Sequence, residues 1–255
     1  MRSYRLSRLG TLVLAMLAVF AFGAIVATAA QAVEEAPRFS VAKKLLKKGE
    51  SEEPSVTAVG SSTLTAGADV VTCTTLEVKK GAKLLGSEAG EAGTGEATLR
   101  YSGCTVTGNG TPCEVTSKEV ETVALRAELV EDAATKKVLL VDFLPASGSL
   151  FTTLKFTGTG CTVKETKVTG KDVLAQVRTA GGRVVELGLT AEEALSWHAE
   201  VLKEQPPSFW LVKGGVGKTV TLEEAEKLMA FGVPAKLEGT AALALVSGKE
   251  WSPLP

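Results

Sequence analysis

Apolar and polar positions alternate in short runs along most of the chain, and glycine-rich segments separate the runs. Strand patterns rich in β-branched residues recur at residues 70–78, 97–106, 120–130, 137–144, 150–156, 161–168 and 173–178. Many short strands at this spacing predict an all-β fold, mainly an antiparallel sandwich or barrel. We expect the two strands on either side of residues 131–136 to pair with each other. Strands and helices do not alternate regularly, which argues against a doubly wound parallel sheet.

The last third of the chain has a less uniform pattern. Residues 190–202 begin with Thr190 and carry Glu193 three positions later, which is the spacing of a capping box at a helix N-terminus. Residues 221–230 repeat this spacing with Glu224. We therefore predict two short helices in this third, while either segment remains open to recruitment as a strand.

The N-terminus has the three parts of a secretory signal peptide. Its positively charged part contains Arg2, Arg5 and Arg8. Residues 9–32 carry no charge and end in Ala-Ala-Gln-Ala, small residues that a signal peptidase accepts. We expect cleavage after Ala32, with Ala29 as the alternative site. The competing interpretation is an uncleaved membrane anchor, because about 18 apolar residues are enough to span a bilayer.

The pattern divides the chain into three regions. Residues 1–32 are the signal peptide, residues 33–54 a polar lead-in or linker, and residues 55–255 one β-rich, disulfide-bonded domain. The lead-in is rich in lysine and glutamate, and residues 39–46 within it have room for one or two helical turns. The chain left after cleavage is long enough for one sizeable domain.

Charge argues against one class of partner. The formal net charge of the full chain is −1, and loss of the signal-peptide arginines leaves the mature chain more acidic. Binding to nucleic acid requires clustered lysine and arginine that neutralise phosphates, so we expect no nucleic-acid partner. We also expect no cofactor, and no membrane span once the signal peptide is cleaved.

Four cysteines lie in the mature chain, at Cys73, Cys104, Cys113 and Cys161. An even count in an exported protein predicts two disulfides, for which three pairings are possible. Cys104 and Cys113 bracket a turn-forming segment, which favours a bridge across the neck of a hairpin and leaves Cys73 to pair with Cys161. A zinc site is the poorer interpretation, because the chain has no Cys-x-x-Cys sequence and a single histidine.

Residues 213–219 read Lys-Gly-Gly-Val-Gly-Lys-Thr and resemble the deviant P-loop of partitioning ATPases. In such a loop glycine amides cradle phosphates, and Lys218 and Thr219 would contact phosphate and metal. The chain ends 36 residues after Thr219, which leaves no room for the rest of that nucleotide-binding fold. We therefore interpret the segment as a hairpin or a strand–helix connection, with Gly214 and Gly215 supplying positive φ.

His198 is the only histidine, so Ser-His-Asp or Cys-His catalysis would have to use it. It lies beside Trp197 in an amphipathic segment, and no Gly-x-Ser-x-Gly sequence supplies a serine nucleophile. We interpret His198 as a packing residue. Asn109 begins an Asn-Gly-Thr sequence, which is a glycosylation acceptor in a host that glycosylates.

Hydrolysis of glycosides would require two carboxylates across a cleft. The candidates are Glu192, Glu193, Glu200, Glu223, Glu224 and Glu226. Their clustering on two helix-like segments fits stabilisation of helix N-termini and a solvated face better than it fits a cleft. Trp197, Trp210 and Trp251 are candidates for a sugar-stacking platform, but tryptophans in a chain with few aromatics favour packing roles.

Short segments, several of them around the cysteines, carry a family resemblance. They are Val71-Thr-Cys73, Tyr101-Ser-Gly-Cys104, Thr111-Pro-Cys113, residues 151–156, residues 161–170, residues 229–234 and residues 246–251. In these segments the chain resembles a loose group of exported, β-rich actinobacterial proteins with paired cysteines. The resemblance covers most of the mature chain and implies an exported β fold that bears disulfides. It brings no assigned activity and no functional residues.

These observations lead to two hypotheses about function. The first is a non-catalytic, secreted or cell-envelope protein with a structural or binding role, since no set of titratable residues converges beyond His198. The alternative is an extracellular hydrolase or carbohydrate-active protein that uses carboxylates. The first hypothesis is preferred.

Overall fold

Side chains alternate between more and less buried positions along many strands, as the two-residue period of an extended backbone requires. Strand β5 (Ser62–Ala66) buries Ser62, Leu64 and Ala66 and leaves the two threonines between them half-buried. Strand β24 (Thr240–Leu245) shows the same alternation. One face of each of these strands therefore packs against the interior.

The computed structural model describes residues 36–131, 139–170, 173–177, 184–188, 208–213, 216–221 and 228–254. Every pairing between the strands of these residues is antiparallel. Within them no helix reaches seven residues, and the one helical element is a short 3₁₀ turn, η1 (Thr116–Lys118). The predicted all-β, mainly antiparallel fold is confirmed.

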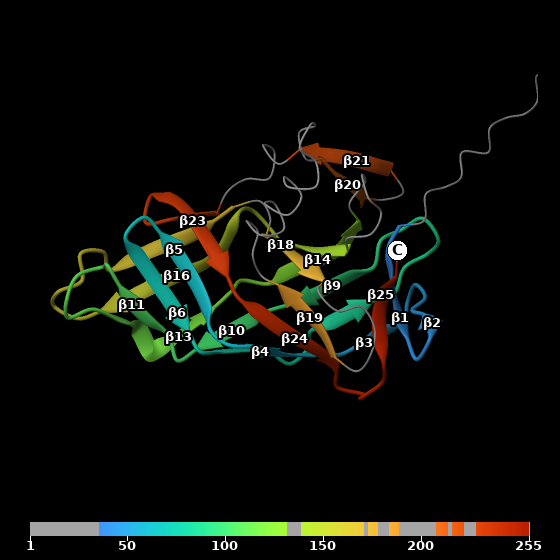
Figure 1. Ribbon diagram of the computed structural model, residues 1–255, viewed down its shortest axis with the longest axis horizontal. Helices are drawn as coiled ribbons and strands as arrows, with labels where there is room; N and C mark the ends of the chain where they lie inside the picture. The colour runs from blue at the N-terminus through green and yellow to red at the C-terminus, as the bar shows by residue number, and fades with distance from the viewer. Residues whose placement is uncertain are drawn as a thin grey trace, which may run out of the picture. The chain divides into compact units, whose positions relative to one another are not determined.

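One sheet has eight strands and curls until its edge strands lie near each other, so that it is nearly a closed barrel. Its order is β11 (Thr105–Thr107), β6 (Asp69–Cys73), β5, β23 (Val233–Glu238), β22 (Leu228–Ala230), β17 (Glu165–Thr169), β16 (Leu150–Thr157) and β12 (Glu114–Val115). Figure 1 shows β5, β6 and β23 together in this barrel-like sheet. The β22–β23 turn is tight, because Phe231 and Gly232 have φ of 52° and 78°, as a type I′ turn requires.

The largest sheet contains fourteen of the described strands. Its order is β13 (Glu119–Glu121), β10 (Leu99–Ser102), β7 (Thr75–Val78), β4 (Pro54–Ala58), β24, β19 (Val184–Gly188), β18 (Val173–Val177), β15 (Leu139–Pro145), β14 (Leu125–Glu131), β9 (Thr94–Ala97), β8 (Lys83–Leu85) and β3 (Ser51–Glu52). A hairpin of β20 (Ser208–Lys213) and β21 (Val216–Thr221) pairs with β14. The predicted pairing across residues 131–136 is present, since β14 and β15 pair along their full lengths.

Part of the segment predicted as a polar lead-in belongs to the folded domain. Strand β1 (Arg38–Val41) pairs with β2 (Lys44–Leu45) on one side and with β25 (Trp251–Leu254) on the other. Phe39 and Val41 are buried. The lead-in prediction is therefore wrong from residue 38 onward, and so are the helical turns predicted for residues 39–46. The sequence around this strand is polar, and the strand forms because its partner β25 lies near the C-terminus.

The two predicted helices have different outcomes. Residues 190–202 lie outside the described residues, so the first helix stays a prediction. The second prediction, over residues 221–230, is wrong at both ends: Thr221 ends β21 and the last three residues form β22. Leu228 and Ala230 are buried in the sheet's interior, and this tertiary burial outweighs the local helix signal.

Candidate functional site

The four cysteines form two disulfides, as their even number predicts, but the pairing differs from the expected one. Cys73 is bonded to Cys104, and Cys113 to Cys161. The predicted bridge between Cys104 and Cys113, which would leave Cys73 with Cys161, is wrong. Two disulfides indicate an oxidising environment for the folded chain.

The Cys73–Cys104 bridge follows from strand register. Residues 70–78 and 99–107 pair antiparallel in one continuous register, in which β6 leads into β7 and β10 leads into β11. Cys73 and Cys104 are opposite each other in this register, with Cα atoms 4.0 Å apart. Both runs pass from one sheet to the other at this point, so the disulfide joins the barrel-like sheet to the largest sheet.

The Cys113–Cys161 bridge lies beside a buried asparagine. The side-chain amide of Asn109 donates to the carbonyl of Val163 at 2.8 Å, and its oxygen accepts from the Val163 amide, also at 2.8 Å. The same amide nitrogen lies 3.4 Å from the sulfur of Cys113. Asn109 is 1% exposed, so its amide serves the fold and is not accessible to a glycosylating enzyme.

The P-loop-like segment is part of a hairpin. Strands β20 and β21 pair antiparallel and leave only residues 214 and 215 between them. Lys218 and Thr219 lie within β21, opposite Leu211 and Trp210. A P-loop instead presents these residue types at the start of a helix. The hairpin interpretation of residues 213–219 is therefore confirmed.

The other sequence-predicted candidates form no shared site in the described residues. Trp197, His198 and the six candidate glutamates lie outside those residues. Trp210 lies in β20 and Trp251 in β25. Trp251 is 4% exposed, and its ring nitrogen donates to the carbonyl of Leu243 at 3.3 Å. It is therefore a packing residue and not part of an exposed sugar platform.

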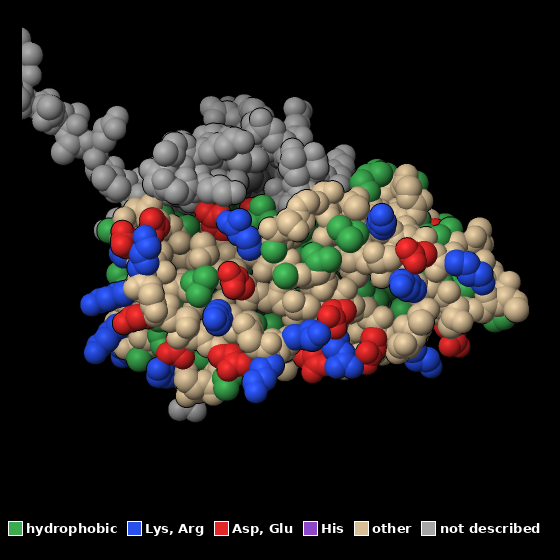
Figure 2. Space-filling model, turned by 180° about the vertical axis from the view of Figure 1, so that it is seen from behind, with side chains coloured by type: hydrophobic (Ala, Val, Ile, Leu, Met, Phe, Trp, Pro, Cys, Tyr) green, Lys and Arg blue, Asp and Glu red, His purple; other side chains and the backbone are tan. Residues whose placement is uncertain are grey.

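Charged side chains of both signs are interspersed on the face that Figure 2 shows. Arg100 contacts Glu119 at 2.5 Å and Glu77 at 3.6 Å, across neighbouring strands. Lys249 lies 2.6 Å from Glu52, and its hydrogen bond lowers the pKa of that carboxyl. Surface pairs of this kind contribute only ~0–1 kcal/mol each to the free energy of unfolding. We expect them to matter more for strand register and solubility.

A polar groove of about 520 Å³ lies along β8, β9 and β14. Its charged lining residues are Lys48, Glu50, Lys83, Glu91, Arg126 and Glu128. Lys48 lies 3.6 Å from Glu91, so one of these carboxylates is already paired. Carboxylates from three separate segments, Glu50, Glu91 and Glu128, thus line this groove.

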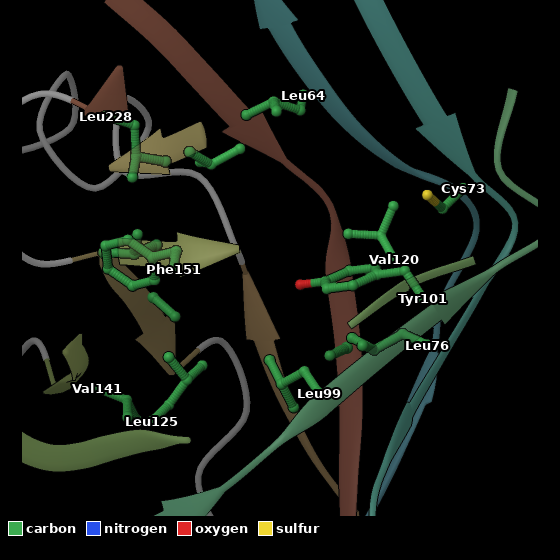
Figure 3. Close-up of a cluster of buried hydrophobic side chains, with 14 of the residues drawn as sticks. Leu64, Cys73, Leu76, Leu99, Tyr101, Val120, Leu125, Val141, Phe151 and Leu228 are labelled. Atoms are coloured by element: carbon green, nitrogen blue, oxygen red, sulfur yellow. The ribbon is translucent and has the colours of Figure 1, made fainter. Parts of the chain in front are cut away.

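A cavity of about 90 Å³ lies inside the domain, between the barrel-like sheet and the largest sheet. Its walls are mostly apolar and include Leu64, Val71, Leu99, Val120, Phe151 and Leu228. Figure 3 shows Leu64, Leu99, Val120, Phe151 and Leu228 converging from several strands.

Tyr101, on β10, brings a phenol to this cavity. Figure 3 shows its hydroxyl at the inner end of the ring, pointing into the space framed by Leu64, Phe151 and Leu99. Burial raises the pKa of Tyr101 to about 12, so the phenol is neutral and able to donate a hydrogen bond at ordinary pH. Among the described residues, no hydrogen-bond partner of this hydroxyl is found.

Ser62, on β5, also belongs to the cavity lining. Ser62 is 4% exposed, and its fully buried Oγ has no hydrogen-bond partner in the described part of the chain. The two threonines of the lining are paired, because Thr122 accepts from the Leu99 amide at 3.0 Å and Thr152 donates to the Glu121 carbonyl at 2.6 Å. The cavity thus combines apolar walls with one phenol hydroxyl that points into the open space.

Sequence reasoning placed Tyr101 in a strand but did not identify Tyr101 or Ser62 as site residues. The alternation of Leu99 and Tyr101 along one strand face was the available signal for an inward-facing phenol. Nothing in the sequence links Tyr101 to Ser62, because they reach the same cavity from different sheets.

The described residues lack two further features. None of their helices is long and apolar enough to cross a bilayer. They contain no group of three or more His, Cys, Asp or Glu side chains arranged to hold a metal ion.

No protein-family model matches the chain, and neither a curated protein nor a solved structure does so. The site is therefore interpreted from its own residues.

Proposed function

We propose that this protein is an exported, non-catalytic binding protein of the cell exterior or cell envelope. Residues 1–32 direct export as a cleaved signal peptide, and the domain that follows binds a ligand in its interior without transforming it. The observation that carries the binding role is the apolar cavity into which the Tyr101 hydroxyl points.

Two observations support export. The cysteines pair in two disulfides, which persist in oxidising compartments and are rare in the cytosol. The N-terminal arginines, the uncharged stretch and the small residues before Val33 have the order that signal peptidases recognise.

The non-catalytic role is supported by the placement of charge. Among the described residues, the ion-paired side chains lie mostly at the surface, as with Arg100 and its two glutamate partners. Among the described residues that line the cavity, none is ionisable except Tyr101 and the disulfide-bonded Cys73, and the phenol stays protonated at ordinary pH. A neutral phenol in an apolar space suits binding through a hydrogen bond better than proton transfer.

Export is tested by producing the full chain in a bacterial host and fractionating the cells. We expect the protein in the medium or envelope fraction, with a new N-terminus at Val33 and no thiol that reacts with an alkylating agent before reduction. An N-terminus at Ala30 would assign cleavage to the alternative site. A full-length chain in the cytoplasm with four reactive thiols would refute export.

The absence of catalysis is tested with a panel of chromogenic glycosides and esters. We expect no turnover above that of a heat-denatured sample. Turnover that falls sharply in Glu91→Gln or Glu128→Gln would replace the binding role by the carboxylate hydrolase, located in the polar groove. A matched control is Glu53→Gln, an exposed residue outside the groove lining.

A further inference from the structure

We propose that the cavity between the two sheets binds a small, neutral, mainly apolar molecule whose carbonyl oxygen accepts a hydrogen bond from Tyr101. The proposal rests on the proposed binding function and names the ligand class for that site.

Volume and lining limit the ligand. The cavity measures about 90 Å³, whereas a dry apolar protein cavity of about 150 Å³ is known to hold benzene. A molecule of roughly four to six non-hydrogen atoms is therefore the expected size. The walls exclude a charged ligand, because moving an ion into apolar surroundings without a counter-charge is strongly unfavourable.

The Tyr101 hydroxyl determines the polar part of the ligand. It points into the open space between the apolar side chains. The phenol can donate, and a donor among apolar walls without an acceptor is unfavourable. A carbonyl oxygen has two lone pairs and donates nothing, so it satisfies this donor without needing an acceptor in return. A hydrocarbon of the same size would fill the space and leave the phenol without an acceptor.

Water is the competing occupant. A buried water typically makes about three hydrogen bonds, and the cavity has room for several waters. Among the described residues of the lining, Thr122 and Thr152 already bond to the backbone and the Ser62 Oγ is fully buried, which leaves the Tyr101 hydroxyl as a partner for water. Several waters would therefore lack partners, which favours a mainly apolar occupant.

The composition of the chain provides a direct probe. The full chain has two tyrosines, Tyr4 and Tyr101, and cleavage of the signal peptide removes Tyr4. The exported protein grown with 3-fluorotyrosine should therefore give one fluorine NMR signal, from Tyr101. We expect cyclopentanone to shift this signal saturably, and cyclopentane to shift it less because it accepts no hydrogen bond.

The decisive comparison uses Tyr101→Phe, which removes only the hydroxyl. Calorimetric titration should show cyclopentanone binding weakened roughly three- to tenfold in this variant, the size of one neutral hydrogen bond, with cyclopentane binding unchanged. Leu64→Phe should fill the cavity and abolish binding of both probes, while Val59→Phe, at a position 46% exposed, should leave both unchanged.

The proposal is overturned if cyclopentanone leaves the fluorine signal unchanged up to its solubility limit, because water alone then occupies the cavity. It is also overturned if cyclopentanone and cyclopentane bind the wild-type chain and Tyr101→Phe equally. If Leu64→Phe does not fold, the comparison with Tyr101→Phe still decides. Export and the lack of turnover are measured separately, so failure of the ligand class is distinguishable from failure of the proposed function.

Discussion

Tyr101 shows how one residue's environment changes its chemistry. Its strand pattern predicts only an inward-facing side chain, but the surrounding sheets remove the phenol from water. Desolvation disfavours the phenolate, and the pKa rises from the ordinary value of 10.0 to about 12. The hydroxyl therefore stays protonated, and remains a donor, until the pH approaches about 12.

The raised pKa predicts a dependence of stability on pH. Because the folded-state pKa lies above the unfolded one, the folded state keeps the Tyr101 proton longer. The contribution is complete below pH 10 and is lost as the pH rises toward about 12, at about 1.4 kcal/mol per pH unit. Phenolate absorbance of the mature chain should titrate near pH 12 when folded and near pH 10 in denaturant. A folded chain that titrates near pH 10 would contradict the burial.

At the scale of elements, the Cys113–Cys161 disulfide lies where two turns that are distant in sequence pack together. Residues 108–113 and 158–163 lie against each other beside the Cys113–Cys161 bridge. A methyl group at Gly110 would lie only 2.0 Å from the carbonyl oxygen of Gly160, and Gly110 also has φ of +87°. Glycine is therefore required here for both conformation and close approach.

This contact gives a prediction with a matched control. Gly49 has φ of +88° but nothing within 4 Å of an added methyl group, so Gly49→Ala measures only the cost of placing a side chain in a left-handed backbone conformation. We expect Gly49→Ala to cost about 1–2 kcal/mol. Gly110→Ala should cost about 1–3 kcal/mol more, because the backbone must shift. Denaturant unfolding under oxidising conditions measures both, and equal losses would disprove the close approach.

The disulfide pairing is testable by peptide mapping. Trypsin leaves Cys104 and Cys113 on one peptide, residues 101–118, and hydroxylamine cuts that peptide between Asn109 and Gly110. We expect the first half to stay joined to the Cys73 peptide and the second half to the Cys161 peptide. Halves that remain joined to each other without reduction would instead show a Cys104–Cys113 bridge.

At the scale of the whole domain, β1 and β25 join residues from opposite ends of the sequence. The rings of Phe39 and Trp251 meet edge to face with centroids 6.1 Å apart, and both residues are buried. The hydrogen bond from Lys249 to Glu52 connects the same two parts of the chain. Stability of the domain therefore depends on residues near its C-terminus.

Trp251→Ala tests this dependence. Loss of the ring should destabilise the domain by about 3–5 kcal/mol, because a large buried side chain leaves a cavity and β25 loses its anchor. Val246→Ala, at a position 62% exposed, should change the unfolding free energy little. Thermal unfolding monitored by circular dichroism provides the comparison. Equal stabilities of the two variants would show that β25 is not needed.

The sequence by itself determined the all-β class and the two disulfides. Strand alternation is a local property, and an even number of cysteines in an oxidising compartment implies bridges regardless of fold. For residues 213–219 the sequence left a hairpin and a strand–helix connection open, and the pairing of β20 with β21 selects the hairpin.

Tertiary structure decided which cysteines pair, which end segment becomes a strand, and where the cavity lies. Cys73 meets Cys104 because residues 70–78 and 99–107 share one register, and register depends on pairing between segments separated by other strands. Strand β1 forms because β25 is available to pair with it. The cavity requires side chains from both sheets, and the Tyr101 hydroxyl meets it only after the sheets pack. Such long-range contacts leave no local pattern, so only the folded chain reveals them.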